Sequence, residues 1–136
     1  MTKKVIFLDD SNAILKVLTY TIDDLVSEGI IEVKTFSDSL AFAKMLENGE
    51  IEFDMLFSDI NMPDFSGYDV CKLVRSLEKY QHHIVIALTT EVSESSKKIG
   101  KEAGFNGWIT KISAPEVMHA TIGNMILAIN KRGDAQ

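Results

Sequence analysis

The stretch that decides the fold reads Phe53-Asp54-Met55-Leu56-Phe57-Ser58-Asp59-Ile60-Asn61-Met62-Pro63-Asp64-Phe65-Ser66-Gly67. Its apolar run is typical of a buried strand, and the loop of Pro, Asp, Ser and Gly behind it cannot continue that strand. The strand therefore delivers one carboxylate, Asp59, to its own C-terminal tip. Most Asp residues between a strand and a helix form turns or caps. That interpretation is weakened by what the other strands carry at their ends.

Four further stretches predict strands. Residues 5–8 and 84–88 are apolar throughout, as expected of parallel strands that are covered on both faces. Residues 31–35 alternate with a period of two, which favours an edge strand, and residues 108–111 predict a short fifth strand.

The segments between the strands predict helices with one apolar face. Ser11 and Ser66 are expected to cap two of them, while Gly29 and Gly104 are expected to end two. The helix at 91–102 is poorly apolar and should pack weakly and move easily. A capping box at residues 113–116 opens the last helix. The residues expected to face inward are Ile14, Leu15, Leu18, Ile22, Leu25 and Val26 in the first helix, Leu40, Phe42 or Ala43, and Leu46 in the second, Val70, Leu73, Val74 and Leu77 in the third, and Val117, Met118, Thr121, Ile122, Met125, Ile126 and Ile129 in the last.

Strand and helix thus alternate five times, which predicts an α/β domain with a parallel sheet and right-handed crossovers. We expect residues 1–130 to form this domain and residues 131–136 a short C-terminal tail. Ligands of such sheets bind at the carboxyl ends of the strands.

Composition excludes several classes of function. A chain with 46% hydrophobic and 25% charged residues is typical of a globular protein. Its net charge of -6 argues against nonspecific binding to nucleic acid or to anionic membranes. The single cysteine, Cys71, predicts a buried apolar filler and no disulfide framework. Neither a secretory segment nor a membrane span is predicted, so we expect a cytoplasmic protein.

Polar side chains are predicted to gather at one edge of the sheet. Asp9 and Asp10 end the first strand, and Thr89 with Thr90 and Lys111 follow the fourth and fifth. Clustered carboxylates raise one another's pKa unless a cation joins them, and Mg²⁺ prefers such oxygen ligands. With a metal and Lys111 to neutralise charge, Asp59 could attack a phosphorus atom, and Thr89 could donate a hydrogen bond to the phosphoryl group.

Taken together, these residues in this order resemble the response-regulator receiver domains of two-component phosphorelay signal transduction, of the single-domain, CheY-like type. The resemblance rests on Asp9-Asp10, on Asp59 within Ser-Asp-Ile-Asn-Met-Pro-Asp-Phe-Ser-Gly, and on Thr89 and Lys111. It extends to about residue 130. It implies a three-layer flavodoxin-like, doubly wound (βα)5 fold with five parallel strands in the order 2-1-3-4-5.

The resemblance also implies functional roles. Asp59 would be the phosphoacceptor for a histidine kinase or a His-phosphotransfer protein, making the chain a phosphoprotein that carries an aspartyl phosphate. Asp10, Asp59 and the backbone carbonyl of Asn61 would bind Mg²⁺, with Asp9 assisting through water. Thr89 and Lys111 would contact the phosphoryl group.

Three more residues receive roles from the same resemblance. Trp108 stands at the switch aromatic position, which swings inward when the threonine is drawn toward the phosphate, and this role is compatible with a packed edge-strand aromatic. Asn61 and Glu91 stand where family members modulate autodephosphorylation.

The resemblance further implies two partner surfaces. The helix at 91–102, the strand at 108–111 and the last helix would form the face that binds a downstream protein target. Its basic residues Lys97, Lys98 and Lys101 are otherwise a solvated face. The kinase would dock on the helix after Ser11. We expect a monomer or a weak phosphorylation-dependent dimer, with no direct DNA binding because no effector segment follows the last helix.

Two residues depart from the family pattern. Thr90 replaces a small residue and is expected to narrow access to the site. Ile112 replaces a proline whose peptide bond is cis; because a cis bond before a non-proline residue costs about 2.5 to 4 kcal/mol, we expect a trans bond, or a strained cis bond held by packing.

Two other functions stay open. A receiver-fold scaffold that no longer switches is compatible with Thr90 and Ile112. An aspartyl phosphohydrolase is disfavoured because its acids would be spaced Asp-x-Asp, and because no segment is long enough for a cap domain. The adjacent pair His82-His83 predicts a solvated loop rather than a metal site, since neighbouring strand residues point to opposite faces. The preferred interpretation is a phospho-accepting signalling module and not an enzyme.

Overall fold

Five parallel strands form one sheet in the order β2-β1-β3-β4-β5. This computed structural model describes residues 2–111 and 115–134, apart from the side chains of residues 115 and 129–134. The strands are β1 (Lys3–Leu8), β2 (Ile31–Phe36), β3 (Met55–Ser58), β4 (Ile84–Thr89) and β5 (Gly107–Thr110). The helices are α1 (Asn12–Thr21), α2 (Asp23–Ser27), α3 (Ser39–Glu47), α4 (Gly67–Ser76), α5 (Glu94–Ala103) and α6 (Pro115–Asp134). The doubly wound flavodoxin-like fold and its strand order are confirmed.

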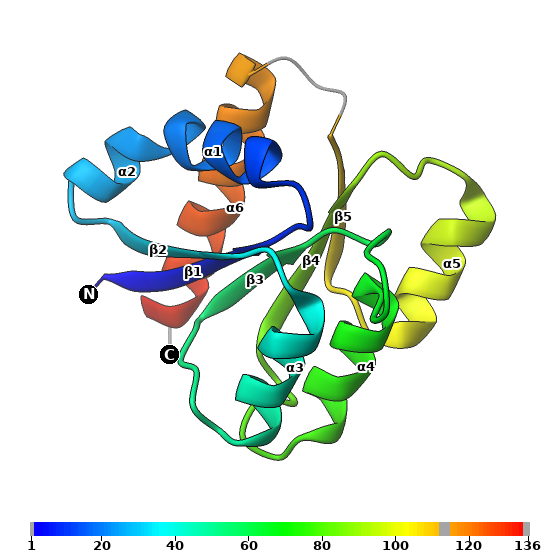
Figure 1. Cartoon of the computed structure of the whole chain (residues 1–136). Helices are drawn as coiled ribbons and strands as arrows, with labels where there is room; N and C mark the ends of the chain where they lie inside the picture. Colours follow the sequence, from blue (N-terminus) through cyan, green and yellow to red (C-terminus); the bar gives the residue numbers. More distant parts are fainter. Residues whose placement is uncertain (1, 112–114, 135–136) are drawn as a thin grey trace.

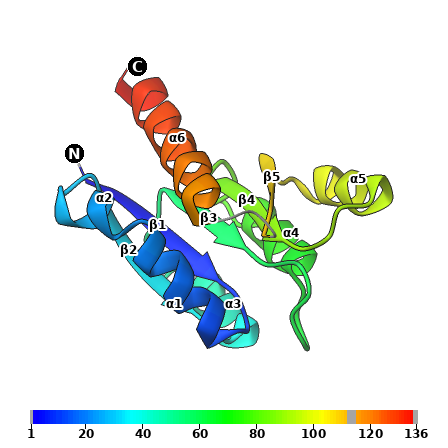
Figure 2. The ribbon, with the colours of Figure 1, turned by 90° about the horizontal axis from the view of Figure 1, so that it is seen from above.

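The sheet separates two layers of helices (Figures 1 and 2). Helices α1, α2 and α6 cover one face, while α3, α4 and α5 cover the other. Two apolar cores correspond to these faces, and β1 contributes to both because successive side chains of a strand point to opposite sides. Val5 and Phe7 belong to the core under α1 and α6, whereas Ile6 and Leu8 belong to the core under α3 and α4.

Polar caps fix where most helices begin. The side chains of Ser11, Asp38, Ser66 and Ser93 each accept a backbone N–H of the first turn. Ser66 forms a full capping box with Asp69. The caps at Ser11 and Ser66 are confirmed, and Gly104 ends α5 with φ at 109°. Helix α5 begins at Glu94 instead of residue 91, because the Ser93 hydroxyl caps it two residues later.

The first expected helix is wrong in one respect, since it is two helices. Ile22 interrupts it with φ −111° and ψ 16°. The hydroxyls of Thr19 and Thr21 donate to the carbonyls of Leu15 and Val17, a pattern that loosens and bends helices. Ile22 itself stays buried, and the chain restarts in α2.

Three residues expected to face inward are exposed. Val26, Leu40 and Val117 are 37%, 43% and 52% exposed, because each lies one position away from the buried stripe of its helix. In α2, which follows the break at Ile22, Leu25 is buried as expected and Val26 is not.

The last helix continues to Asp134, four residues past residue 130, where the domain was expected to end. The division into residues 1–130 and 131–136 stays a prediction. The capping box at 113–116 and the side chain of Ile129 lie outside the described residues. Within the described ranges, no helix has both the length and the apolar character that crossing a membrane requires.

Candidate functional site

Three carboxylates meet at the carboxyl edge of the sheet. Asp9 and Asp10 follow β1, and Asp59 follows β3, the neighbouring strand. One carboxylate oxygen from each lies within 4.8 Å of the others. Backbone groups hold two of them, since the Ser11 N–H donates to Asp9 Oδ1 (2.9 Å) and the Ile60 N–H donates to Asp59 Oδ1 (2.8 Å). Asp9 and Asp59 are buried, whereas Asp10 is exposed.

A lysine that follows the edge strand β5 contacts this cluster. Lys111 follows β5, and its Nζ contacts Asp9 Oδ2 and lies 3.4 Å from Asp59 Oδ2. Its backbone N–H donates to the Thr89 carbonyl (2.9 Å), which fixes the end of β5 against β4. One ammonium therefore contacts two of the three carboxylates, and no ion pair of Lys111 with Asp10 is found among the described residues.

The surroundings of Asp59 disfavour the ionised form of its carboxyl group. Burial is the largest influence and raises the pKa of the Asp59 carboxyl, while the charge of Lys111 lowers it and the charge of Asp9 raises it again. The net direction is upward. A cation bound at the cluster would oppose this shift, because opposite charge favours the ionised form.

The cluster therefore has the chemistry of a site for a hard divalent cation. Carboxylate oxygens are what Mg²⁺ prefers, and the exposed Asp10 leaves one side open to the ion's waters. Asn61, whose carbonyl was predicted as a further ligand, lies two residues beyond Asp59 in the same loop. Its role as a ligand stays a prediction.

The loop after Asp59 depends on a glycine. A Cβ atom on Gly67 would lie 2.0 Å from the Asp59 carbonyl oxygen and 2.8 Å from the Ile60 Cα. The Gly67 N–H donates to the Ile60 carbonyl (2.9 Å), which ties the start of α4 to this loop. Asp64, at the turn between them, has φ at 68°. This role of Gly67 was not predicted, because nothing in the sequence alone indicates so close an approach of two backbone segments.

Thr89 is buried at the end of β4 and contacts the next loop. Its Oγ1 accepts a hydrogen bond from the Glu91 N–H (3.2 Å). A hydroxyl that accepts one hydrogen bond can still donate another. Thr90, the residue between them, is exposed. Whether Thr90 narrows access to the site stays a prediction.

Trp108 is packed beside the same loop. Its Nε1 donates to the Glu91 carbonyl (2.9 Å), and its ring meets Phe105 edge-on, with 6.3 Å between centroids. A Cβ atom on Gly100 of α5 would lie 2.6 Å from Trp108 Cζ3. The indole therefore fits only because residue 100 of α5 is a glycine, which has no side chain to occupy the same space.

Asn61 and Glu91, which sequence analysis paired only by analogy, are in contact. Asn61 Nδ2 donates to Glu91 Oε1 (3.1 Å). The structure thus brings the three acids and Lys111 into one group, and links Thr89, Trp108 and Asn61 through Glu91. The peptide bond before Ile112 lies outside the described residues.

The His82-His83 expectation needs a correction. His82 is exposed as predicted, but His83 is half-buried. Its ring meets Phe53 at 4.9 Å and Tyr80 at 5.5 Å, both edge-on. Burial lowers the pKa of His83. The residue is therefore a packing element, because the loop before β4 folds over the end of the core.

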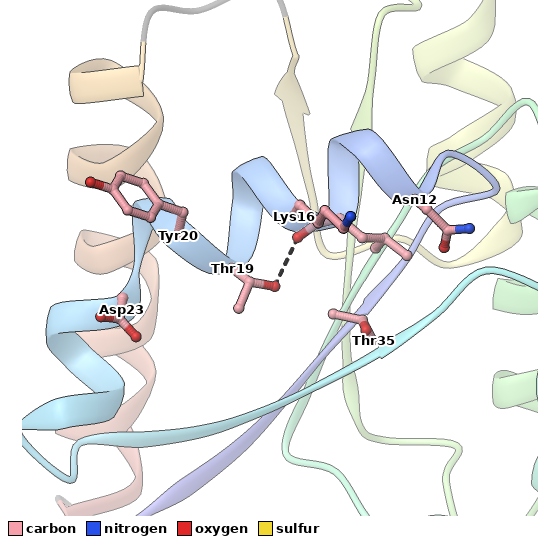
Figure 3. Close-up of a pocket in the computed structure, with 7 residues that line it drawn as sticks. Asn12, Lys16, Thr19, Tyr20, Asp23 and Thr35 are labelled. Atoms are coloured by element: carbon pink, nitrogen blue, oxygen red, sulfur yellow. Dashed lines mark hydrogen bonds between the residues drawn. The ribbon is translucent and has the colours of Figure 1, made fainter.

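A shallow groove runs along α1 beside β2 (Figure 3). It has a volume of about 620 Å³. Figure 3 shows Lys16 and Tyr20 of α1 along it, with Thr35 of β2 across from them. Tyr20 is 85% exposed, and Val17 beside it is also exposed. This is the helix on which the resemblance places the kinase.

The fold and the acidic strand ends define a doubly wound α/β domain with a carboxylate cluster at the carboxyl edge of its sheet, and the comparisons with known proteins assign such a domain to one family. A family model described as response regulator receiver domain matches residues 5–123. The chain belongs to the response regulator receiver family.

Individual relatives are CheY-like. The chemotaxis protein CheY of Pseudomonas aeruginosa is 27% identical over 127 residues, which cover 93% of this chain and 98% of that protein. The chemotaxis protein CheY-3 of Vibrio cholerae is 30% identical over 108 residues, or 79% of each chain. The solved structure of Vibrio cholerae CheY4 superposes with a TM-score of 0.76 at 34% identity and covers 91% of this chain and 98% of its own. The protein is thus the receiver domain of a CheY-like response regulator.

Proposed function

We propose that Asp59 accepts a phosphoryl group from the phosphohistidine of a histidine kinase or of a His-phosphotransfer protein, and that this modification switches the binding of a downstream protein. One observation carries the proposal. Asp59 is buried next to two further acids, buried Asp9 and exposed Asp10, and next to one lysine that comes from another strand end. Structural stability alone does not require such an arrangement, because clustered buried carboxylates are costly.

The chemistry follows from the groups present. An Asp59 carboxylate oxygen forms a bond to phosphorus while the bond between phosphorus and the donor's imidazole nitrogen breaks, and that nitrogen keeps the electron pair. Lys111, which already contacts Asp9 and Asp59, balances charge on the phosphoryl oxygens. The Thr89 hydroxyl donates a hydrogen bond to one of those oxygens.

Asp9, Asp10 and Asp59, with the carbonyl of Asn61, would hold Mg²⁺. The ion would neutralise developing charge on the phosphoryl oxygens, as metal ions do in phosphoryl transfer. Receiver domains bind Mg²⁺ at an acidic cluster of this kind, and the donor set of this chain fits the same ion.

The two partner surfaces lie on different parts of the molecule. The groove along α1 is the proposed surface for the phosphoryl donor, because its residues follow directly on Asp9 and Asp10. The proposed output surface is formed by α5, β5 and α6. On α5, Ile99 is exposed between the exposed residues Lys98 and Lys101, so apolar and basic groups lie together on this helix.

The primary test is incubation of the purified protein with acetyl phosphate and Mg²⁺, read by intact mass. We expect the mass of one phosphoryl group on the wild-type chain and none on Asp59→Asn. The absence of an adduct on the wild-type chain would contradict the proposal and favour the scaffold. Steady turnover of a generic phosphomonoester would instead indicate the phosphohydrolase.

The output surface is tested separately by a pull-down that compares unmodified protein with protein activated by beryllofluoride. A partner specific to the activated form should be lost when Lys97 and Lys101 are changed to Glu. Lys72→Glu, on the exposed side of α4, is the control and should retain it. Retention of the partner by the double variant would exclude this face.

A further inference from the structure

Glu91 connects four separate parts of the molecule. Its N–H donates to Thr89 Oγ1 at the end of β4, and its carbonyl accepts the Trp108 Nε1–H from β5. Its carboxylate is bound at both oxygens: Asn61 Nδ2 donates to Oε1 (3.1 Å) and Ser96 Oγ donates to Oε2 (3.3 Å). Each main-chain and side-chain polar group of Glu91 therefore has a partner on a different element.

Ser96 is itself firmly placed. Its backbone N–H donates to Ser93 Oγ (3.1 Å), and its hydroxyl accepts from the same Ser93 hydroxyl (2.8 Å). Its carbonyl accepts a hydrogen bond from the Tyr68 hydroxyl of α4 (3.1 Å). The first turn of α5 is thus anchored to α4, and the Ser96 hydroxyl is presented to Glu91 from a fixed position.

We infer that Ser96 is a positioning residue that holds the Glu91 carboxylate toward Asn61 and so slows the loss of the phosphoryl group from Asp59. The inference deepens the proposed function and rests on it. Ser96 would thus link the first turn of α5, through Glu91, to the loop that follows Asp59. Thr89 and Trp108 contact the backbone of the same Glu91.

Glu91 and Asn61 gain conformational freedom when they are not paired. A glutamate on a loop has several side-chain rotamers, and fixing one requires contacts that offset the lost entropy. Two donors supply them here, one from Asn61 and one from Ser96. Without Ser96, the carboxylate and the Asn61 amide regain freedom, and both can bind a water molecule next to the acyl phosphate. Attack of that water on phosphorus would return Asp59 and inorganic phosphate.

The test compares three single variants in the full chain. Ser96→Ala removes the hydroxyl but keeps the backbone N–H that Ser93 caps. Ser96→Thr keeps a hydroxyl at the same place. Ser95→Ala is the matched control, since Ser95 is exposed in the same turn and its hydroxyl lies 3.3 Å from that of Ser93.

Two readouts are measured. After phosphorylation with acetyl phosphate and removal of the reagent, Ser96→Ala should lose its phosphoryl group about twofold to fivefold faster than wild type, the range that one partly exposed hydrogen bond accounts for. Ser95→Ala and Ser96→Thr should keep the wild-type rate. In unmodified protein, the side-chain amide resonance of Asn61 should shift in Ser96→Ala and not in Ser95→Ala.

An unchanged or slower rate in Ser96→Ala, or an unshifted Asn61 resonance, would overturn the inference. The resonance needs no phosphoryl group, so it tests the link even if Asp59 cannot be phosphorylated. If neither the wild-type protein nor any variant forms an adduct, the proposed function fails. The role of Ser96 in phosphoryl lifetime is then overturned as well, and a shifted Asn61 resonance would show only that Ser96 has a structural role.

Discussion

Gly67 and Asp59 are in backbone contact: a Cβ atom on Gly67 would lie 2.0 Å from the Asp59 carbonyl oxygen. The start of α4 is therefore pressed against the peptide of the acceptor residue. The position of the Asp59 carboxylate consequently depends on a residue that carries no functional group.

We predict that Gly67→Ala destabilises the protein by about 2 kcal/mol or more, because the contact is with backbone that cannot move without displacing the acceptor loop. The yield of phosphorylated protein should fall as well. Urea unfolding measures the first effect and intact mass the second. Gly123→Ala on α6 is the control, since its Cβ would meet Leu25 Cδ1 at an ordinary 3.9 Å; it should be neutral or stabilising by about 0.5 to 1 kcal/mol. Wild-type stability of Gly67→Ala would refute the close contact.

The raised pKa of Asp59 has a consequence for pH dependence. A folded state that holds the proton more tightly than the unfolded state loses stability as the pH rises from the ordinary Asp pKa, near 4, through the raised value in the folded protein. Asp59→Asn removes this loss. The stability gained by Asp59→Asn over wild type should thus be larger at pH 7 than at pH 3.5, as measured by urea unfolding at both. A difference between the two proteins that does not change with pH would contradict the direction of this shift.

Mg²⁺ should stabilise the folded chain, because the ion would bind the acidic cluster that only the folded state assembles. With free Mg²⁺ tenfold above its dissociation constant, we expect a gain of about 1.4 kcal/mol in the free energy of unfolding. Asp10→Asn should gain less at the same concentration. Asp54→Asn, an exposed acid at the other end of β3 that accepts the Lys4 N–H (2.7 Å), should respond as wild type does. Equal gains in all three proteins would place the ion elsewhere.

Gly100→Ala should displace the indole of Trp108, since the added Cβ would lie 2.6 Å from its ring. Trp108 is the chain's single tryptophan, so its fluorescence reports this change directly. We expect emission at longer wavelength and stronger quenching by acrylamide as the ring moves toward water. Glu102→Ala, at an exposed position of the same helix, is the matched control. An unchanged spectrum in Gly100→Ala would show that the ring and α5 shift together.

Much of the fold could be predicted because the strands are short apolar runs that end on polar residues. Asp9, Asp59 and Lys111 follow three strands, and the rule that parallel strands end at the same edge was enough to bring them together. The break at Ile22 was missed because helical spacing of apolar residues continues through it. The hydroxyls that loosen the helix there act on backbone carbonyls, which leave no trace in the apolar pattern.

Side-chain hydrogen bonds that join separate loops were beyond sequence analysis for a similar reason. Arg75 was given no role, yet its guanidinium donates to the carbonyls of Gly104 (2.7 Å) and His83 (2.6 Å), and to Asn106 Oδ1 (2.7 Å). These partners lie on loops distant in sequence, and their positions are known only once the helices are packed. The same holds for Glu91, whose partners come from four elements.

The interruption at Ile22 also bears on how partner choice could change over time. The break makes α1 a separate helix of ten residues, and Val17 and Tyr20 lie on its solvent side. The chain that follows packs into the core through Ile22 and Leu25. On the proposed role of α1 as the docking surface of the phosphoryl donor, substitutions at Val17 and Tyr20 are expected to alter recognition while the buried side chains of Ile22 and Leu25 stay in place. If α1 has this proposed role, the docking surface could change in evolution while the residues of the acidic site around Asp59 stay the same.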